Sequence, residues 1–431
     1  MHKSILSNKW LRLPLLLSCF SAPLAGHAGI EVQAGDWNLQ FSGNVNAFST
    51  NTDCDADKSG DSIAGGLACG SNGNDYKSSN IQTGLLPAWF SFNAENTDAN
   101  GFYTGLTIGF QPGVDSNIKA LGSNLDGALG MNSSNFRQVF LEFGNKNEWG
   151  TFKLGRDIGV FGSDAILSDM TLYGVGTVSD LAIHGGNTTL GRIGVGYLYA
   201  DWKAQIQYIS PSWSGFSINL ALVDPWGASS LANQKAVGHG SAKTYSLTGV
   251  SGLQKSDTYG FEGKLNYTFD DGKLWAGFIR QDVEFEASGL DEDNPTATGF
   301  DIGGKYSMGP ASLLAYYYTG EGIGTTTFLT DAFDTSGKER DSDGFYIQGM
   351  YTVPDLGTKV GLSYGQSNLD ANKGDKDTAL VETNESYIIG LYQPIGHGIN
   401  LVAEYTHTEA EAHDDTQAEE DTISLGAILF F

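Results

Sequence analysis

Charged side chains are concentrated in one irregular stretch of the sequence, residues 149–192. A short alternating run at its start contains Lys153 and Arg156, and a second Gly-Arg pair at its end contains Arg192. About 35 residues without clear periodicity lie between them, which is long for a connection inside a compact domain and indicates a functional segment. That segment carries four carboxylates: Asp157, Asp164, Asp169 and Asp180. Opposed charges that face each other across a narrow, wet gap create a transverse field, which orders water and orients dipolar solutes.

A second group of oxygen-bearing side chains lies at residues 51–61. Its oxygens occur at alternate positions, as in calcium-binding loops, and include those of Asp53, Asp55 and Asp57. Lys58 stands where such a loop needs glycine, and no glutamate closes the pattern. A weak calcium site and an acidic, solvated loop both remain open. No Cys/His metal spacing is present, so we expect no resident metal or other cofactor.

The third candidate for chemistry is a set of histidines and carboxylates near the C-terminus: His407, His413, Asp414 and Asp415. Such residues occur in hydrolases, but no nucleophile motif accompanies them. His413 also falls in a run of mostly charged residues. We therefore expect no catalysis, and an outer-membrane hydrolase is kept only as a remote alternative.

The first 28 residues have the pattern of a secretory signal peptide. Lys3, Lys9 and Arg12 make a basic start, an apolar run follows at 13–24, and small residues precede a cleavage site after Ala28. Residues 16–19, ending in Cys19, also resemble a lipoprotein cleavage box, which is the alternative. The mature chain, 29–431, is expected to be a single domain.

The charge of the mature chain excludes one class of partner. Loss of three basic residues with the signal peptide takes the formal net charge from −26 to −29. A chain this acidic is not expected to bind nucleic acid. No mature segment approaches the roughly 18 apolar residues that a membrane-spanning helix needs.

Two cysteines remain after cleavage, Cys54 and Cys69, and both lie in one polar segment. An exported chain enters an oxidising compartment, so we predict a disulfide that closes this segment.

The elements that must position these side chains are short strands. In the first of them Trp37, Leu39 and Phe41 alternate with polar residues, so one face is apolar and the other polar. In a soluble sandwich the apolar face would meet a core, and in an outer-membrane barrel it would meet lipid. One strand does not decide between them.

The whole series of strands decides between a soluble sandwich and an outer-membrane barrel. After the first strand we predict strands at 80–94, 101–112, 136–143, 150–157, a strand ending near Ser210, 216–223, 257–269, 274–283, 299–307, 311–319, 344–352, 357–366, 384–393, 398–408 and 422–431. Long and short connections alternate, as expected of a meander that crosses a bilayer. Closure follows because unpaired strand edges cannot face hydrocarbon. We therefore predict an all-β fold, a transmembrane antiparallel β-barrel of about 16 strands. Its third long loop, about 158–191, would fold into the lumen.

The last strand supports this prediction. Ile423, Leu425, Ala427, Leu429 and Phe431 alternate with polar or small residues, and the chain stops at Phe431. We expect Leu425, Leu429 and Phe431 to face lipid. A terminal aromatic strand resembles the assembly signal of outer-membrane barrels.

Four stretches together resemble the general diffusion porins of Gram-negative bacteria, which are trimeric and have sixteen strands. They are 136–143 (FRQVFLEF), 149–156 (WGTFKLGR), 208–217 (YISPSWSGFS) and the closing strand. The strand pattern extends the likeness over the whole mature chain.

The resemblance implies a pore constriction with a basic wall and an acidic loop. Arg156 and Arg192 match wall positions, and Asp169 matches a loop position. Tyr173 stands where the family often has a second acid. Lys153, Arg137 and Asp164 complete the predicted constriction. Simple alternation turns Lys153 inward and Arg156 outward, so a bulge at Gly155 would be needed to bring Arg156 into the lumen. The alternative for Arg156 is an ion pair with Asp157 or Glu142.

These observations predict a passive outer-membrane channel for ions and small polar solutes. The acidic balance predicts a preference for cations at low salt, and the resemblance implies a homotrimer. Partners would be outer-membrane lipid and lipopolysaccharide, which would share divalent cations with acidic outer runs such as 291–293 and 419–421. A channel specific for one class of solute is the main alternative.

Overall fold

The computed structural model describes residues 29–56, 63–69, 75–114, 136–178, 188–226, 256–284, 294–334, 336–373, 375 and 378–431. The predicted signal peptide, Asp57, Asp180 and the acidic run at 291–293 lie outside this part of the chain. Within it, no helix is long and apolar enough to cross a membrane.

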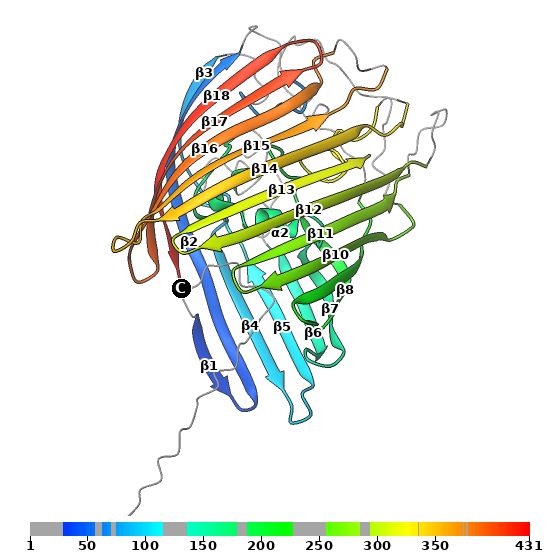
Figure 1. Ribbon diagram of the computed structural model, residues 1–431, viewed down its shortest axis with the longest axis vertical. Coiled ribbons are helices and arrows are strands. Elements are labelled where there is room, and N and C mark those ends of the chain that lie inside the picture. Colours follow the sequence, from blue (N-terminus) through cyan, green and yellow to red (C-terminus); the bar gives the residue numbers. More distant parts are fainter. Residues whose placement is uncertain are drawn as a thin grey trace, which may run out of the picture.

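One antiparallel sheet of eighteen strands forms the wall of a barrel (Figure 1). The strands are β1 (Ile30–Ala34), β2 (Trp37–Ala56), β3 (Tyr76–Gln82), β4 (Trp89–Thr97), β5 (Tyr103–Phe110), β6 (Gln138–Asn145), β7 (Gly150–Ile158), β8 (Trp202–Ile209), β9 (Phe216–Val223), β10 (Gly260–Phe269), β11 (Gly272–Asp282), β12 (Thr296–Met308), β13 (Ala311–Glu321), β14 (Asp341–Thr352), β15 (Lys359–Leu369), β16 (Val381–Gly396), β17 (Ile399–Ala412) and β18 (Gln417–Phe430). Consecutive strands pair along the wall, and the pairing of β18 with β2 closes it.

Two strand positions in this wall are each shared by two segments. β3 and β4 pair with successive parts of the same edge of β2, so they form one interrupted strand. On the opposite edge of β2, β1 pairs with Trp37–Phe41, next to the part of β2 that pairs with β18. β18 and β1 therefore also form one interrupted strand. The barrel therefore has sixteen strand positions, which confirms the predicted number.

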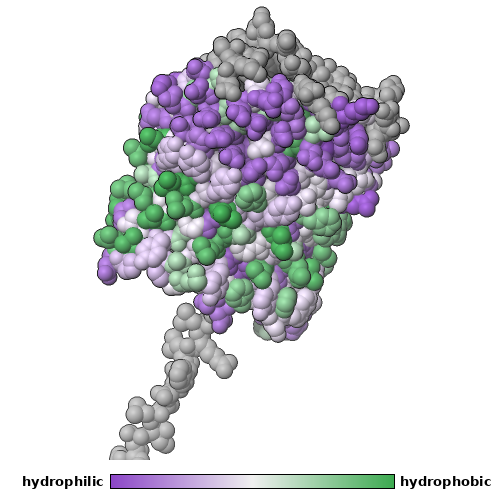
Figure 2. Space-filling view, turned by 45° about the horizontal axis from the view of Figure 1, so that its top comes forward, coloured by the Kyte–Doolittle hydropathy of each residue, from purple (hydrophilic) through white to green (hydrophobic). Residues whose placement is uncertain are grey.

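Alternation along the strands separates an outer from an inner face. On β18, Ile423 and Leu425 are 53% and 55% exposed, whereas Thr422 and Ser424 between them are buried. Leu429 is half-buried on the same outer face, and Phe431 ends beside Gly43, with which it exchanges two backbone hydrogen bonds. Figure 2 shows apolar residues over the lower part of the surface and hydrophilic residues above them. This arrangement is expected of a barrel set in a bilayer.

Part of the barrel interior is apolar, contrary to the expectation of a polar inner face. The inner sides of β11, β13 and β14 carry Trp275, Ile279, Tyr316, Tyr318 and Tyr346, all buried. They pack in one core with residues of the irregular segments that fold into the barrel, such as Phe161, Leu198 and Phe328. These strands are therefore apolar on both faces, one toward lipid and one toward the inner core.

Two of the predicted strands differ from the observed ones. The predicted strand 80–94 is interrupted, because Thr83–Ala88 leave the wall and Leu85 packs into the inner core. The strand predicted to end near Ser210 begins only at Trp202, as β8, and the alternating run at 193–199 that precedes it is not a wall strand. Its Ile193, Tyr197 and Leu198 are buried inside the barrel, so apolar alternation there reflects burial rather than pairing with β7.

Candidate functional site

The irregular segment between β7 and β8, residues 159–201, lies against the inner face of the barrel. We call it the lumen segment; its described parts are 159–178 and 188–201. It contains the short helix α2 (Ser163–Ile166) and the 3-10 turn η2 (Met170–Tyr173). Figure 1 shows α2 behind the strands β11 and β12. The segment is longer than the predicted 158–191, since it includes the run 193–199.

Inward-facing side chains of four strands hold this segment by its backbone. Glu262 of β10 accepts the N–H groups of Val160 and Phe161, at 2.5 and 2.9 Å. Asp301 of β12 accepts the N–H of Gly162 at 2.9 Å, and Gln348 of β14 accepts that of Met170 at 2.8 Å. A segment without regular structure leaves many N–H groups unpaired, and charged acceptors satisfy them strongly.

The fourth anchor is Glu404 of β17. Its carboxylate is 3% exposed and accepts the N–H groups of Val175 and Gly176, at 2.6 and 2.9 Å, and the hydroxyl of Tyr392 at 2.7 Å. A Cβ at residue 174 would lie 2.1 Å from the Oε1 atom of Glu404, so a larger residue than glycine would displace this carboxylate. The anchors together fix the segment along the wall from β10 to β17.

Asp164 meets a basic part of the wall. Its carboxylate pairs with Lys264 of β10 at 2.6 Å and with Lys273 of β11 at 2.5 Å. Lys305 of β12 lies directly opposite Lys273 in the strand register and on the same inner face. We call Lys264, Lys273 and Lys305 the lysine patch. Burial would raise the pKa of the Asp164 carboxyl, but the charges of Lys264 and Lys273 outweigh it and hold that pKa well below its usual range.

Asp169 and Arg192 do not face each other across an open gap, as the resemblance implied. Both are buried, at 3% and 0% exposure. Asp169 caps η2 by accepting the N–H of Thr171 at 2.9 Å, and it accepts the hydroxyl of Tyr197 at the same distance. Arg192 donates to Ser363 and to the carbonyl of Ser386, on β15 and β16. Burial raises the pKa of Asp169, although the charge of Arg192 opposes it. Arg192 therefore fastens the lumen segment to the wall, whereas Asp169 joins two parts of the segment to each other.

Arg156 lies on the outward face of the wall. The register of β7 with β6 and β8 runs through Gly155 without a shift, so the bulge expected there is absent. Arg156 pairs in register with Val139 and Ala204, which are exposed on that face. It forms neither of the ion pairs considered for it among the described residues, and its Nε is buried without a hydrogen-bond partner.

The other predicted constriction residues occupy separate places. Lys153 faces inward, as alternation predicts, and pairs with Asp157 at 2.6 Å. Tyr173 packs edge-on against Phe430 and Tyr392. The ammonium group of Lys359, on β15, lies 5.1 Å from the centre of the Tyr173 ring.

Arg137 precedes β6, and its N–H donates to the side chain of Gln111 at 2.9 Å. The structure therefore brings Asp164 to lysines but does not gather the predicted arginines with it.

Sequence reasoning missed the lysine patch and the four anchors. The sequence does contain a signal for the patch. Apolar and polar residues alternate along these strands, and the alternation places Lys264, Lys273 and Lys305 at inward positions. The signal was weak because the strand at 274–283 is apolar on both faces, so its inner side could not be chosen. The anchors gave no signal, since a carboxylate that binds backbone looks like any lumen-facing acid.

The remaining candidates have ordinary partners. The predicted disulfide joins Cys54 and Cys69. Asp53 pairs with Lys77 at 2.5 Å, and Asp55 is exposed on the outer face. No group of three or more His, Cys, Asp or Glu side chains in the described part of the chain could hold a metal ion.

His407 faces outward and lies between Glu409 and Asp421, at 2.7 and 2.8 Å. His413 contacts the carbonyl of Leu369 at 2.9 Å. The two histidines are thus held in separate places, and neither is paired with a serine or cysteine nucleophile in these contacts.

Comparisons with known proteins agree with the barrel. Residues 17–413 match the sequence model of a family described as Gram-negative porin. No curated protein sequence matches the chain. Among solved structures, the outer membrane channel DcaP of Acinetobacter baumannii is similar with a TM-score of 0.64 and 14% identity, over 94% of this chain and 100% of that one.

Two further structures are similar over most of their length. The anion-selective porin from Comamonas acidovorans has a TM-score of 0.57 and 12% identity, over 92% of this chain and 100% of that one. OmpT of Vibrio cholerae, in its trimer form, has a TM-score of 0.51 and 15% identity, over 92% of this chain and 99% of that one. At such identities the likeness concerns the fold.

Proposed function

The chain belongs to the Gram-negative porin family and is an outer-membrane channel, and we propose that ions and small polar solutes cross it passively. The route passes between the lumen segment and the part of the inner wall to which the segment is not anchored. The observation that carries this proposal is the pairing of Asp164 with Lys264 and Lys273. It holds the segment at a fixed place and leaves charge of both signs beside the route. Polar solutes would be oriented there and apolar ones disfavoured.

The preference for cations depends on salt. The acidic excess of the whole chain attracts cations to the mouths of the barrel, and at 0.01 M salt its field reaches about 30 Å. Deeper inside, the lysine patch carries three positive charges, and Asp164 pairs with two of them. At 1 M salt the field of the mouths falls off within about 3 Å, so the patch alone acts on a passing ion. We therefore propose a cation preference at low salt that weakens as salt rises.

The test is conductance and reversal potential in a planar lipid bilayer. The purified protein should give ohmic steps, and a KCl gradient at low ionic strength should give a reversal potential of the sign for K⁺. The same measurement at high ionic strength should give a smaller value. A bilayer that stays sealed would contradict the channel proposal. A reversal potential of the sign for Cl⁻ at low salt would contradict the cation preference.

We also propose a homotrimer that contacts neighbours through the strands at both chain ends. β2, β17 and β18 adjoin one another, and their outer faces carry exposed Val45, Leu401 and Leu425. The trimer form of OmpT supports the proposal by likeness of fold. Triplet conductance steps and a trimer mass in detergent would test it. Lipopolysaccharide is the proposed partner at the acidic upper surface, through shared divalent cations.

A channel specific for one class of solute is the second candidate. The inner core and the anchored segment fill part of the barrel, which leaves less room than a polar lumen of this strand number would. Saturable block of the current by one solute would favour this candidate, and a linear rise of flux with concentration would favour general diffusion.

A further inference from the structure

A second segment, residues 63–69, folds onto the inner face of the barrel at the end opposite the short turns. We call it the strap. It forms a short backbone pairing with residues 379–381, through hydrogen bonds from Ala64 to Ala379 and from Val381 to Ala64, at 2.7 and 2.9 Å. Asn384 of β16 binds it twice, by accepting the N–H of Leu67 at 2.8 Å and donating to the carbonyl of Gly65 at 3.1 Å.

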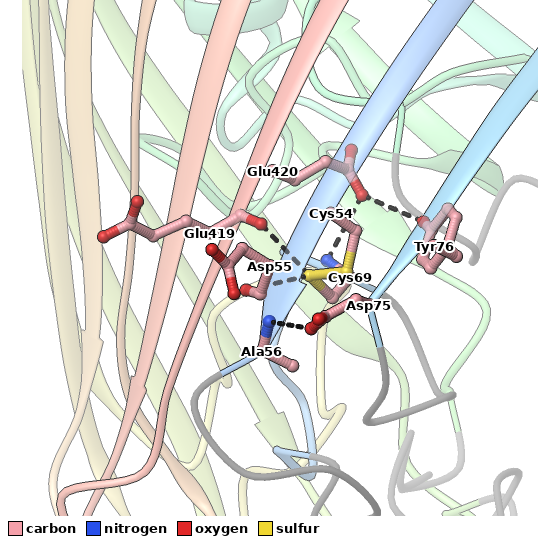
Figure 3. Close-up of a disulfide and its surroundings, with 8 residues drawn as sticks. All are labelled: Cys54, Asp55, Ala56, Cys69, Asp75, Tyr76, Glu419 and Glu420. Carbon is pink, nitrogen blue, oxygen red and sulfur yellow. Dashed lines mark hydrogen bonds between the residues drawn. A yellow bond between two sulfur atoms is a disulfide. The ribbon is translucent and has the colours of Figure 1, made fainter.

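The disulfide closes the other end of the strap. Cys69 is bonded to Cys54, an inward residue of β2, and its N–H donates to Glu420 of β18 at 3.2 Å (Figure 3). Tyr76 donates to the same carboxylate oxygen of Glu420 at 3.2 Å. The strap therefore runs across the inner faces of β2, β18, β17 and β16, a width of about 15 Å at the usual strand spacing.

The backbone conformation of Cys69 indicates that specific contacts fix this end of the strap. Its φ is 57°, in the left-handed region that a residue with a side chain seldom adopts. Such a conformation persists only when surrounding contacts fix it. The disulfide and the bond to Glu420 are those contacts, and both cysteines are buried.

The strap also touches the other segments inside the barrel. A Cβ added at Gly194 of the lumen segment would lie 2.6 Å from the side chain of Leu67. A Cβ added at Gly65 would lie 3.1 Å from the carboxylate of Asp331, in the irregular residues 322–334. Leu67 is fully buried by these neighbours. The strap, the lumen segment and residues 322–334 thus meet inside the barrel, farther from the short turns than the lysine patch is.

We propose that the disulfide-held strap determines the solute size limit at the entrance of the channel, as a second narrow zone apart from the lysine patch. The inference rests on the proposed function, because it concerns a passage. While the bond between Cys54 and Cys69 is intact, the strap takes up part of the cross-section. Without that bond only the hydrogen bonds to Asn384, Glu420 and residues 379–381 and the packing of the strap hold it, so it leaves the wall more often and the entrance widens.

The test compares the wild-type protein with the double variant C54S/C69S. We expect a higher single-channel conductance in the variant. In liposome swelling, we also expect the rate for a trisaccharide relative to a monosaccharide to rise at least about twofold. Dithiothreitol added to the wild-type channel should cause the same changes.

Two further variants separate this role from a loss of folding. N384A keeps the disulfide but removes both side-chain bonds to the strap, so it should shift the size limit in the same direction. Y76F removes a hydrogen bond to Glu420 but keeps the aromatic ring and every hydrogen bond of the strap itself, so it should behave as wild type. Each variant is first checked for a folded barrel by its resistance to unfolding in detergent at room temperature.

The outcomes distinguish the two proposals. A wild-type protein that leaves the bilayer sealed contradicts the channel itself. A wild-type channel whose size limit stays the same in folded C54S/C69S and in N384A contradicts the role of the strap and leaves the channel intact.

Discussion

Replacement of Asp164 by asparagine tests the link between the lumen segment and the wall most directly. Asp164 of α2 forms ion pairs with two members of the lysine patch, at 2.6 Å to Lys264 and 2.5 Å to Lys273, and Ser163 of the same helix accepts a hydrogen bond from Lys264 at 2.8 Å. The D164N variant keeps the size of the side chain but removes the charge. Two ammonium groups then remain near the inner wall without their carboxylate.

The magnitude follows from the burial of the three groups. Removal of one partner from a buried ion pair costs about 3–5 kcal/mol, because the other charge stays buried and unpaired. The side chains of Lys264, Asp164 and Lys273 are 10%, 11% and 23% exposed, so water reaches them in part. The lower end, about 3 kcal/mol, is therefore expected, and it would raise the ratio of detached to docked α2 roughly a hundredfold.

The assay is the single-channel current. Glu262 and Asp301 hold the residues before α2 and remain in place, so D164N should fold and conduct. Its open-channel current should be noisier, because α2 leaves and rejoins the wall. The reversal potential should move toward Cl⁻, since the net charge of Asp164, Lys264 and Lys273 rises from one to two positive charges.

The control variants separate the two effects. K305Q removes a charge from the lysine patch without touching the Asp164 pairs, so it should move the reversal potential toward K⁺ and leave the noise unchanged. D164E retains the charge and should stay close to wild type. The reasoning is refuted if D164N has the noise and the reversal potential of wild type.

Two further predictions concern the contacts of the lumen segment, and a third concerns a separate buried ion pair. The difference in current noise between D164N and wild type should be the same at pH 7 and pH 5. Because the pKa of Asp164 is lowered, its ion pairs are fully present above the ordinary carboxyl pKa and are lost only as pH falls through the lowered pKa. A noise difference that vanishes by pH 5 would contradict this lowered pKa. E404Q should raise current noise by weakening two backbone anchors at Val175 and Gly176, and G174A should do the same by steric contact with Glu404; currents as steady as wild type in both would contradict the anchor role. R340K should lower the thermal unfolding temperature, because Arg340 is fully buried and binds Asp375 with two nitrogens, at 2.7 and 2.9 Å, and lysine cannot form that fork; an unchanged temperature, measured by loss of the folded band in detergent, would argue against it.

The sequence determined the wall of this protein. Apolar and polar residues alternate with the period of a strand, and the strand breaks fall at short turns and long loops in strict order, so the fold class and the number of strand positions follow from local pattern. The runs 37–41 and 423–425 illustrate this, since their apolar residues Trp37, Leu39, Phe41, Ile423 and Leu425 lie on the outer face. The disulfide was also predictable, because two cysteines in one exported segment have no other ordinary partner.

Only the tertiary structure decided which charged residues meet. Alternation assigns a side chain to a face but says nothing of what folds back across the barrel, so Lys153 was placed correctly while the partners of Asp164 were not. Arg192 and Asp169 were expected beside water, and both are buried because the run at 193–199 follows the lumen segment inward instead of joining the wall. For the same reason, the sequence alone does not show which face of the strands at 274–283 and 311–319 is the inner one. Their inner faces are apolar to match an interior packed with loop residues, and that packing depends on contacts between residues more than a hundred positions apart, such as Gly162 with Asp301, which no local pattern records.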